Sequence, residues 1–162
     1  MVKAVFPGSF DPPTNGHLNL IKRGSELFDS LDVVVSNNLH KKYQLETQER
    51  FDLMKEITEG IANVKVSLWN SLIVDYATNN NISVILRGVR DIADFGYEFE
   101  LSMMNKQLAP HIETVFLPTE QKYFVLRSSS IKELVQLGAD VSSMVPSNVE
   151  ALMKKKVVLS GG

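Results

Sequence analysis

The sequence predicts a single doubly wound α/β domain with a five-stranded parallel sheet, spanning residues 1–162. Short β-branched runs alternate with longer segments of helical period, which is the pattern of repeated βαβ units. The runs are almost continuously apolar, as parallel strands are when helices cover both faces of the sheet. No internal repeat or low-complexity linker divides the chain. In such a fold, ligands bind beyond the carboxyl ends of the strands.

Five strands are expected, at residues 2–6, 31–36, 64–68, 83–86 and 114–117. Three helices between them are indicated by apolar side chains at helical spacing, and Thr47 is expected to cap the second. The three stripes are Leu18, Ile21 and Phe28; Phe51, Met54, Ile57 and Ile61; and Ile92, Phe95, Phe99 and Met103. Stripes of this kind usually pack in the core, so we assign all three to it.

The C-terminal region predicts two more helices. Residues 130–133, from Ser130 to Glu133, have the spacing of a capping box, and Gly138 is a natural helix stop. Residues 147–150 repeat the capping-box spacing behind Pro146. Residues 157–162 match no useful pattern and are expected to form a frayed tail.

Composition excludes several classes of protein. The 17 Lys and Arg residues against 19 Asp and Glu residues leave a net charge of -2, which argues against a nucleic-acid partner. There is no cysteine, so disulfides, thiolate metal sites and thiol nucleophiles are excluded together. No apolar run approaches the roughly 18 residues of a membrane span, and Pro7 interrupts any signal-peptide stretch. We expect a cytoplasmic protein without a membrane partner.

The most informative segment runs from Pro7 to His17, between the first strand and the first helix. Gly8 is expected to let the backbone approach a ligand closely, and Gly16 to clear space before a helix whose free N–H groups attract anions. His17 falls at that positive helix end, where its ring can donate to a phosphate oxygen gaining charge in a transition state. The alternative is a turn with a capping or solvent-facing histidine, but the whole segment favours a ligand site.

Two further groups fall on the expected ligand edge. Residues 87–90, Arg-Gly-Val-Arg, begin where the fourth strand ends and carry two guanidinium groups suited to phosphate. The alternative is a strand-end turn with two solvated arginines. Residues 128–130 are three serines at the start of a helix, where hydroxyl and N–H groups can hold a polyphosphate or simply cap the helix.

The chain resembles a known family on these motifs. Thr14-Asn15-Gly16-His17 is similar to the T-x-G-H element of the α/β-phosphodiester-forming nucleotidyltransferases, which have a Rossmann-like fold. Within that superfamily the chain resembles the phosphopantetheine adenylyltransferases of bacterial coenzyme A synthesis. The closer resemblance covers essentially the whole chain, through blocks at residues 7–12, 41–42, 49–50, 87–90, 94–98, 104–106 and 128–130.

The resemblance implies a role for each matching residue. His17 would stabilise the transition state; the 4'-phosphopantetheine substrate would contact Ser9, Lys41, Ile73, Arg87 and Asn105. ATP would contact Ser9, Phe10, His17, Gly88, Val89, Arg90, Glu98, Tyr123, Phe124, Val125, Leu126, Arg127, Ser128 and Ser129. Three residues depart from the family pattern: Ser9 replaces a common Thr, Gly96 a frequent Glu, and Arg127 an apolar residue.

The reaction implied is adenylyl transfer from ATP to 4'-phosphopantetheine, giving dephospho-coenzyme A and pyrophosphate by direct in-line attack. Mg²⁺ would be held mainly by substrate phosphates and water, because no carboxylate cluster suggests a dedicated metal site. The resemblance further implies a homohexamer and possible feedback by coenzyme A. Two alternatives stay open: a nicotinate-mononucleotide adenylyltransferase or cytidylyltransferase, which share the T-x-G-H element, and a non-catalytic nucleotide or coenzyme A sensor.

Overall fold

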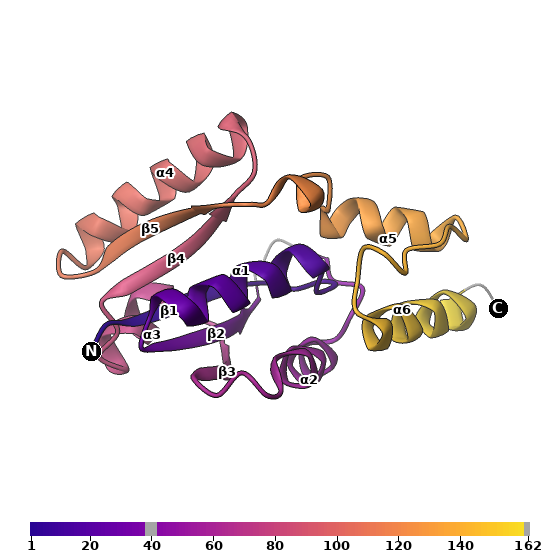
Figure 1. Cartoon of the computed structure of the whole chain (residues 1–162), viewed down its shortest axis with the longest axis horizontal. Helices are drawn as coiled ribbons and strands as arrows, with labels where there is room; N and C mark the ends of the chain where they lie inside the picture. Colours follow the sequence, from indigo (N-terminus) through magenta and orange to yellow (C-terminus); the bar gives the residue numbers. More distant parts are fainter. Residues whose placement is uncertain (38–41, 161–162) are drawn as a thin grey trace.

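The chain folds around one parallel β-sheet with helices on both faces (Figure 1). The computed structural model describes residues 1–37 and 42–160. The strands lie in the order β3-β2-β1-β4-β5, and each neighbouring pair is parallel. They are β1 (Lys3–Gly8), β2 (Ser30–Ser36), β3 (Val64–Trp69), β4 (Val84–Val89) and β5 (Glu113–Pro118). The doubly wound fold predicted from the sequence is confirmed.

Helices connect the strands, and two more follow β5. They are α1 (Asn15–Leu27), α2 (Thr47–Thr58), α3 (Ile73–Asn79), α4 (Ile92–Leu108), α5 (Ser128–Gln136) and α6 (Ser147–Ser160), with a short 3₁₀ turn, η1 (Gln121–Tyr123), before α5. The expected frayed tail is wrong for residues 157–160, because α6 continues through them and Val157 packs against the C-terminal core.

Three apolar clusters form the core. Alternate residues of the central strands, such as Phe6 and Leu86, face α1 and α2 on one side of the sheet. The intervening residues, such as Val5 and Ile85, face α3 on the other side. A third cluster joins α2, α5 and α6 through residues such as Leu53, Ile131 and Met153. This third cluster fixes α5 and α6 beside α2, next to the carboxyl edge of the sheet.

Helix α4 contradicts the expectation that its apolar stripe lies in the core. Ile92, Phe95, Phe99 and Met103 are all exposed, with Ile92 at 90%. The residues of α4 that are buried are polar, and Glu98 is one of them. The helical periodicity correctly predicted that these four residues share one face of α4, but that face points to solvent rather than to the core. The opposite face carries Glu98, whose ion pair is described below.

Two expected caps are also wrong. Thr47 is the first residue of α2 rather than its cap, and its hydroxyl donates to the Asn37 side chain at 3.2 Å. Helix α5 begins at Ser128, so Ser130 lies inside it, and the capping position belongs to Arg127. Gly138 does follow the end of α5, with a φ of 77° that favours glycine.

Among the described residues, no helix is both long enough and apolar enough to cross a bilayer.

Candidate active site

The strand order reverses between β1 and β4, which is where a doubly wound sheet opens its ligand crevice. Ladder pairing between these strands covers only Ala4 with Val84 and Val5 with Ile85. Pairing of β1 with β2 and of β4 with β5 continues to the strand ends. The carboxyl halves of β1 and β4 are therefore not paired with each other in the sheet.

A cavity of about 410 Å³ lies at this opening. Its walls come from the end of β1 and the following loop, the first turn of α1, the end of β4, α4, and the segment from η1 to the start of α5. The lining residues are Phe6, Pro7, Gly8, Ser9, Phe10, Thr14, Gly16, His17, Leu20, Arg87, Gly88, Arg90, Asp94, Glu98, Thr119, Tyr123, Leu126, Arg127, Ser128 and Ser129.

The loop after β1 is held from within. Phe10 is buried and has a φ of 48°, a strained value for an aromatic residue. A Cβ added to Gly8 would lie 2.7 Å from the Phe10 ring, and one added to Gly88 would lie 2.3 Å from Leu20. A side chain at either position would therefore meet Phe10 or Leu20, and both glycines line the cavity.

Two buried charges tie this loop to its neighbours. Arg50, fully buried on α2, donates to the carbonyl oxygens of Ser9 at 2.7 Å and Ser36 at 3.2 Å. Burial lowers the pKa of Arg50. The buried Asp11 carboxylate accepts from the Leu45 N–H at 2.9 Å and from Lys132 Nζ of α5 at 2.9 Å. These contacts fix the positions of the β1–α1 loop, the start of α2 and helix α5 relative to one another.

His17 is fixed by the cap of α1. Thr14 is the N-cap residue, and its hydroxyl accepts from the His17 backbone N–H at 3.2 Å. The Thr14 backbone N–H donates in return to His17 Nδ1 at 3.1 Å. Because Nδ1 accepts this bond, the neutral ring carries its proton on Nε2. His17 lines the cavity, and a ring protonated on Nε2 is a hydrogen-bond donor on its side away from Thr14.

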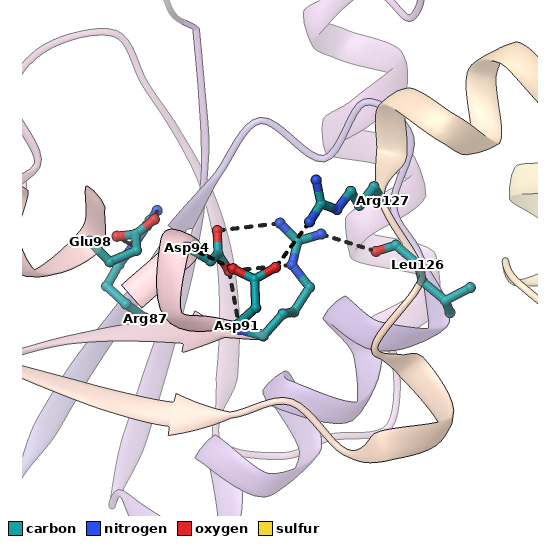
Figure 2. Close-up of polar contacts among 7 residues, drawn as sticks. Arg87, Asp91, Asp94, Glu98, Leu126 and Arg127 are labelled. Carbon is teal, nitrogen blue, oxygen red and sulfur yellow. Dashed lines mark hydrogen bonds and ion pairs between the residues drawn. The ribbon is translucent and has the colours of Figure 1, made fainter. Parts of the chain in front are cut away.

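Arg87 is held rigidly at the end of β4. Its Nε and Nη2 donate to the two carboxylate oxygens of Glu98 at 2.6 Å and 2.5 Å (Figure 2). Its Nη1 donates to the Pro7 carbonyl at 2.8 Å. Glu98 comes from the inner face of α4 and is 6% exposed, which explains why that face is polar. A guanidinium has five N–H donors, so these three bonds leave two for a ligand.

A second charged group lies at the mouth of the cavity. Arg90 Nε is 3.3 Å from Asp94 Oδ2, and Arg90 Nη1 donates to the Leu126 carbonyl at 3.4 Å. Arg127 Nη2 donates to Asp91 Oδ2 at 3.0 Å (Figure 2). Both arginines predicted at residues 87 and 90 therefore face carboxylates rather than solvent alone.

Most predicted site residues meet at this cavity. Ser9, Phe10, His17, Arg87, Gly88, Arg90, Glu98, Tyr123, Leu126, Arg127, Ser128 and Ser129 line it. Val89, Phe124, Val125, Ile73 and Asn105 do not; Ile73 opens α3 and packs against the second core cluster, and Asn105 lies on α4. Lys41 lies outside the described residues. The roles assigned to all of these residues, those that line the cavity included, stay predictions.

Sequence reasoning missed the residues that support the site. Asp11 stands within the quoted motif, Arg50 stands next to Glu49 in another, and neither had been given a function. One signal was available for Arg50, because it occupies the apolar face of α2 at helical spacing from Leu53 and Met54. A charge in such a stripe indicates a buried, bonded group.

Comparison with known proteins gives a consistent result. The cytidylyltransferase-like family model matches residues 5–134. A phosphopantetheine adenylyltransferase of Caldanaerobacter subterraneus subsp. tengcongensis is 48% identical over 94% of this chain and 96% of that protein. One from Dictyoglomus thermophilum is 41% identical over 96% of this chain and 95% of that protein.

A solved structure shares the fold. It is that of a candidate nicotinate-nucleotide adenylyltransferase from Vibrio parahaemolyticus, with a TM-score of 0.68 over 97% of this chain and 95% of that one. The two sequences are 19% identical, so the likeness concerns the fold alone.

Proposed function

The chain belongs to the phosphopantetheine adenylyltransferase family, and from this premise we propose that it moves the adenylyl group of ATP to 4'-phosphopantetheine. The products are dephospho-coenzyme A and pyrophosphate. The observation that carries the proposal is the pairing of a fixed His17 donor with two arginines in one cavity at the sheet's switch point.

The reaction needs no nucleophilic side chain. A phosphate oxygen of 4'-phosphopantetheine attacks the α-phosphorus of ATP, a new P–O bond forms, and the bond from that phosphorus to the β-phosphate oxygen breaks. Pyrophosphate leaves with the electron pair. The protein's contribution is alignment and charge stabilisation, which dominate transfers at phosphorus. We propose direct in-line transfer without a covalent enzyme intermediate.

His17 acts on the developing charge. Its Nδ1 is occupied by the Thr14 N–H, so the ring cannot rotate to another partner without losing that bond. The Nε2–H is therefore oriented before the reaction begins and does not reorganise as charge gathers on the α-phosphate oxygens. Such a donor stabilises the transition state more than bound ATP.

Arg87 is the proposed ligand of the phosphopantetheine phosphate. Glu98 and the Pro7 carbonyl hold its guanidinium in one orientation, so little side-chain entropy remains to be lost on binding. Arg90, with the start of α5 at Ser128 and Ser129, is the proposed binding region for the ATP phosphates. Lys41, Ile73 and Asn105 remain proposed contacts of the acceptor.

Mg²⁺ is proposed to arrive with the nucleotide. Among residues 1–37 and 42–160 there is no group of three or more metal-binding side chains. The ion would be held by phosphate oxygens and water, and it would neutralise part of the polyphosphate charge.

The exposed apolar residues of α4 support a self-association proposal. Phe95, Phe99, Met103 and Leu108 are each at least 42% exposed, although large apolar groups gathered on one helix are ordinarily covered. We propose that copies of the chain cover this helix in a homohexamer.

Two further proposals concern regulation and location. Coenzyme A shares the product's adenylate and pantetheine parts, and we propose that it acts as a feedback ligand. We also propose a cytoplasmic location.

The test is an acceptor panel with purified protein and ATP. Pyrophosphate release should require 4'-phosphopantetheine and should scale with protein concentration. Turnover of nicotinate mononucleotide instead, or of CTP in place of ATP, would assign the chain to another activity of the superfamily. Nucleotide binding with no pyrophosphate release on any acceptor would indicate a sensor.

A further inference from the structure

Two contacts cross the mouth of the cavity, from the β4–α4 turn to the segment that enters α5. Arg90 Nη1 donates to the Leu126 carbonyl at 3.4 Å, and Arg127 Nη2 donates to Asp91 Oδ2 at 3.0 Å (Figure 2). Arg90, Leu126 and Arg127 all line the cavity. The turn and the segment are separated by α4, β5 and η1 in the sequence, so these contacts join two distant walls of the site.

Each member of the second contact occupies a helix-capping position. Asp91 is the N-cap of α4 and accepts from the Asp94 N–H at 2.8 Å. Arg127 is the N-cap of α5 and makes no side-chain capping bond there. The Asp94 N–H, together with Arg127, holds the pKa of the Asp91 carboxyl below its usual range, so the pair is ionised near neutral pH. Holding these two side chains together therefore holds the starts of two helices together.

The first turn of α5 has a separate attachment on its other side. Ser128 Oγ donates to the Pro12 carbonyl at 2.8 Å, and Lys132 Nζ donates to the buried Asp11 at 2.9 Å. Those contacts anchor α5 to the β1–α1 loop, whereas the Leu126 carbonyl and the Arg127 side chain make their contacts on the α4 side. Because the Arg127 side chain is 54% exposed, its ion pair with Asp91 is weak and sensitive to salt.

We propose that Arg127 is a positioning residue for the nucleotide: its ion pair with Asp91 holds residues 126–129 over the cavity, and Arg127 acts through Asp91 rather than as a direct phosphate ligand. Arg127 is also one of the positions at which this chain departs from the pattern of the family it resembles. The nucleotide part of this inference rests on the proposed function, whereas the contact between the two helix starts does not.

The test uses two single variants and their combination. Asp91→Asn removes the charge yet keeps the cap of α4, because Asn and Asp cap helices equally well. Arg127→Met removes the charge from the other side. Lys154→Met, which breaks an exposed ion pair with Glu150 on α6 away from the cavity, is the matched control. ATP affinity is measured by calorimetry without acceptor, at low and at high salt.

The proposal expects Asp91→Asn and Arg127→Met each to weaken ATP binding by about two- to fivefold at low salt, with the control unchanged. The double variant should be no weaker than either single variant, and the loss should shrink in high salt. If Arg127 binds phosphate directly, Arg127→Met weakens ATP binding while Asp91→Asn leaves it unchanged or tightens it. That result overturns the proposal.

A second measurement does not depend on ATP. The Ile131 N–H donates to the Arg127 carbonyl in the first turn of α5, so its hydrogen exchange reports on that turn. Exchange in the nucleotide-free protein should rise by a similar factor in both single variants and not in the control. Faster exchange in a protein that binds no ATP would contradict the proposed function while supporting the contact; unchanged exchange would contradict the contact itself.

Discussion

Replacing His17 separates its role in the helix cap from its role in the reaction. The His17 side chain accepts the Thr14 N–H and completes the cap of α1, and it also lines the cavity as a donor. His17→Ala removes both. His17→Gln removes only the second, because a Thr followed three residues later by Gln is itself a capping box.

The two losses have different sizes. Losing the side-chain half of the capping box costs up to about 1 kcal/mol, because Thr14 still caps the backbone N–H of residue 17, and this lowers the melting temperature of a chain this long by at most about 2–4 °C. Losing a preorganised donor to a developing oxyanion costs about 10²–10³ in turnover, or about 2.7–4 kcal/mol. ATP keeps its other contacts, so its affinity should change by less than about tenfold.

The assay compares thermal unfolding, calorimetric ATP binding and steady-state turnover for both variants. His17→Ala should melt a few degrees lower and lose at least about a hundredfold in kcat. His17→Gln should regain the melting temperature yet stay well below wild-type kcat. If Gln restored turnover along with stability, or if ATP binding collapsed while kcat stayed near normal, the catalytic role of His17 would be refuted.

Three further outcomes are expected. Arg87→Ala should weaken 4'-phosphopantetheine more than ATP, and Arg87→Lys should stay impaired because an ammonium cannot replace the fork; an equal loss for unphosphorylated pantetheine would argue against the phosphate contact. Lys132→Met should leave the Asp11 carboxylate buried without its cation and cost about 3–5 kcal/mol in urea unfolding, with Lys132→Arg closer to wild type, and equal losses in the two would count against the ion pair. Sedimentation at micromolar concentration should show assemblies well above the 18.1 kDa monomer that Phe99→Asp disrupts, and a monomer alone would contradict the α4 interface.

The strands were predictable because each is a short, largely apolar run, as expected of parallel strands covered by helices on both faces. Their ends were not, because Gly8 and Gly88 look like turn residues and are kept in the sheet by ladder partners on β2 and β5. Which face of α4 is buried could not be predicted either, again because a contact with another element decides it. Its stripe is apolar at the right spacing, but the Arg87 fork draws Glu98 inward, and that contact depends on residues eleven positions apart on different elements.

The site could be predicted in outline because its residues are concentrated in a few segments at strand ends, where the fold gathers them. The supporting contacts could not, because they join segments far apart in the sequence. Asp11 and Lys132 are separated by 121 positions, and Arg127 and Asp91 by 36. In a single sequence, nothing about one residue of such a pair indicates which residue is its partner.

The account's central claim is direct adenylyl transfer to 4'-phosphopantetheine in the cavity beside His17. Its most direct test is a single-turnover reaction with ATP labelled on the α-phosphate, followed by mass analysis of the small molecules and of the denatured protein. The account predicts labelled dephospho-coenzyme A and one pyrophosphate for each ATP consumed, with no label on the protein. Label bound covalently to the chain, or an adenylated product only with a different acceptor, would contradict it.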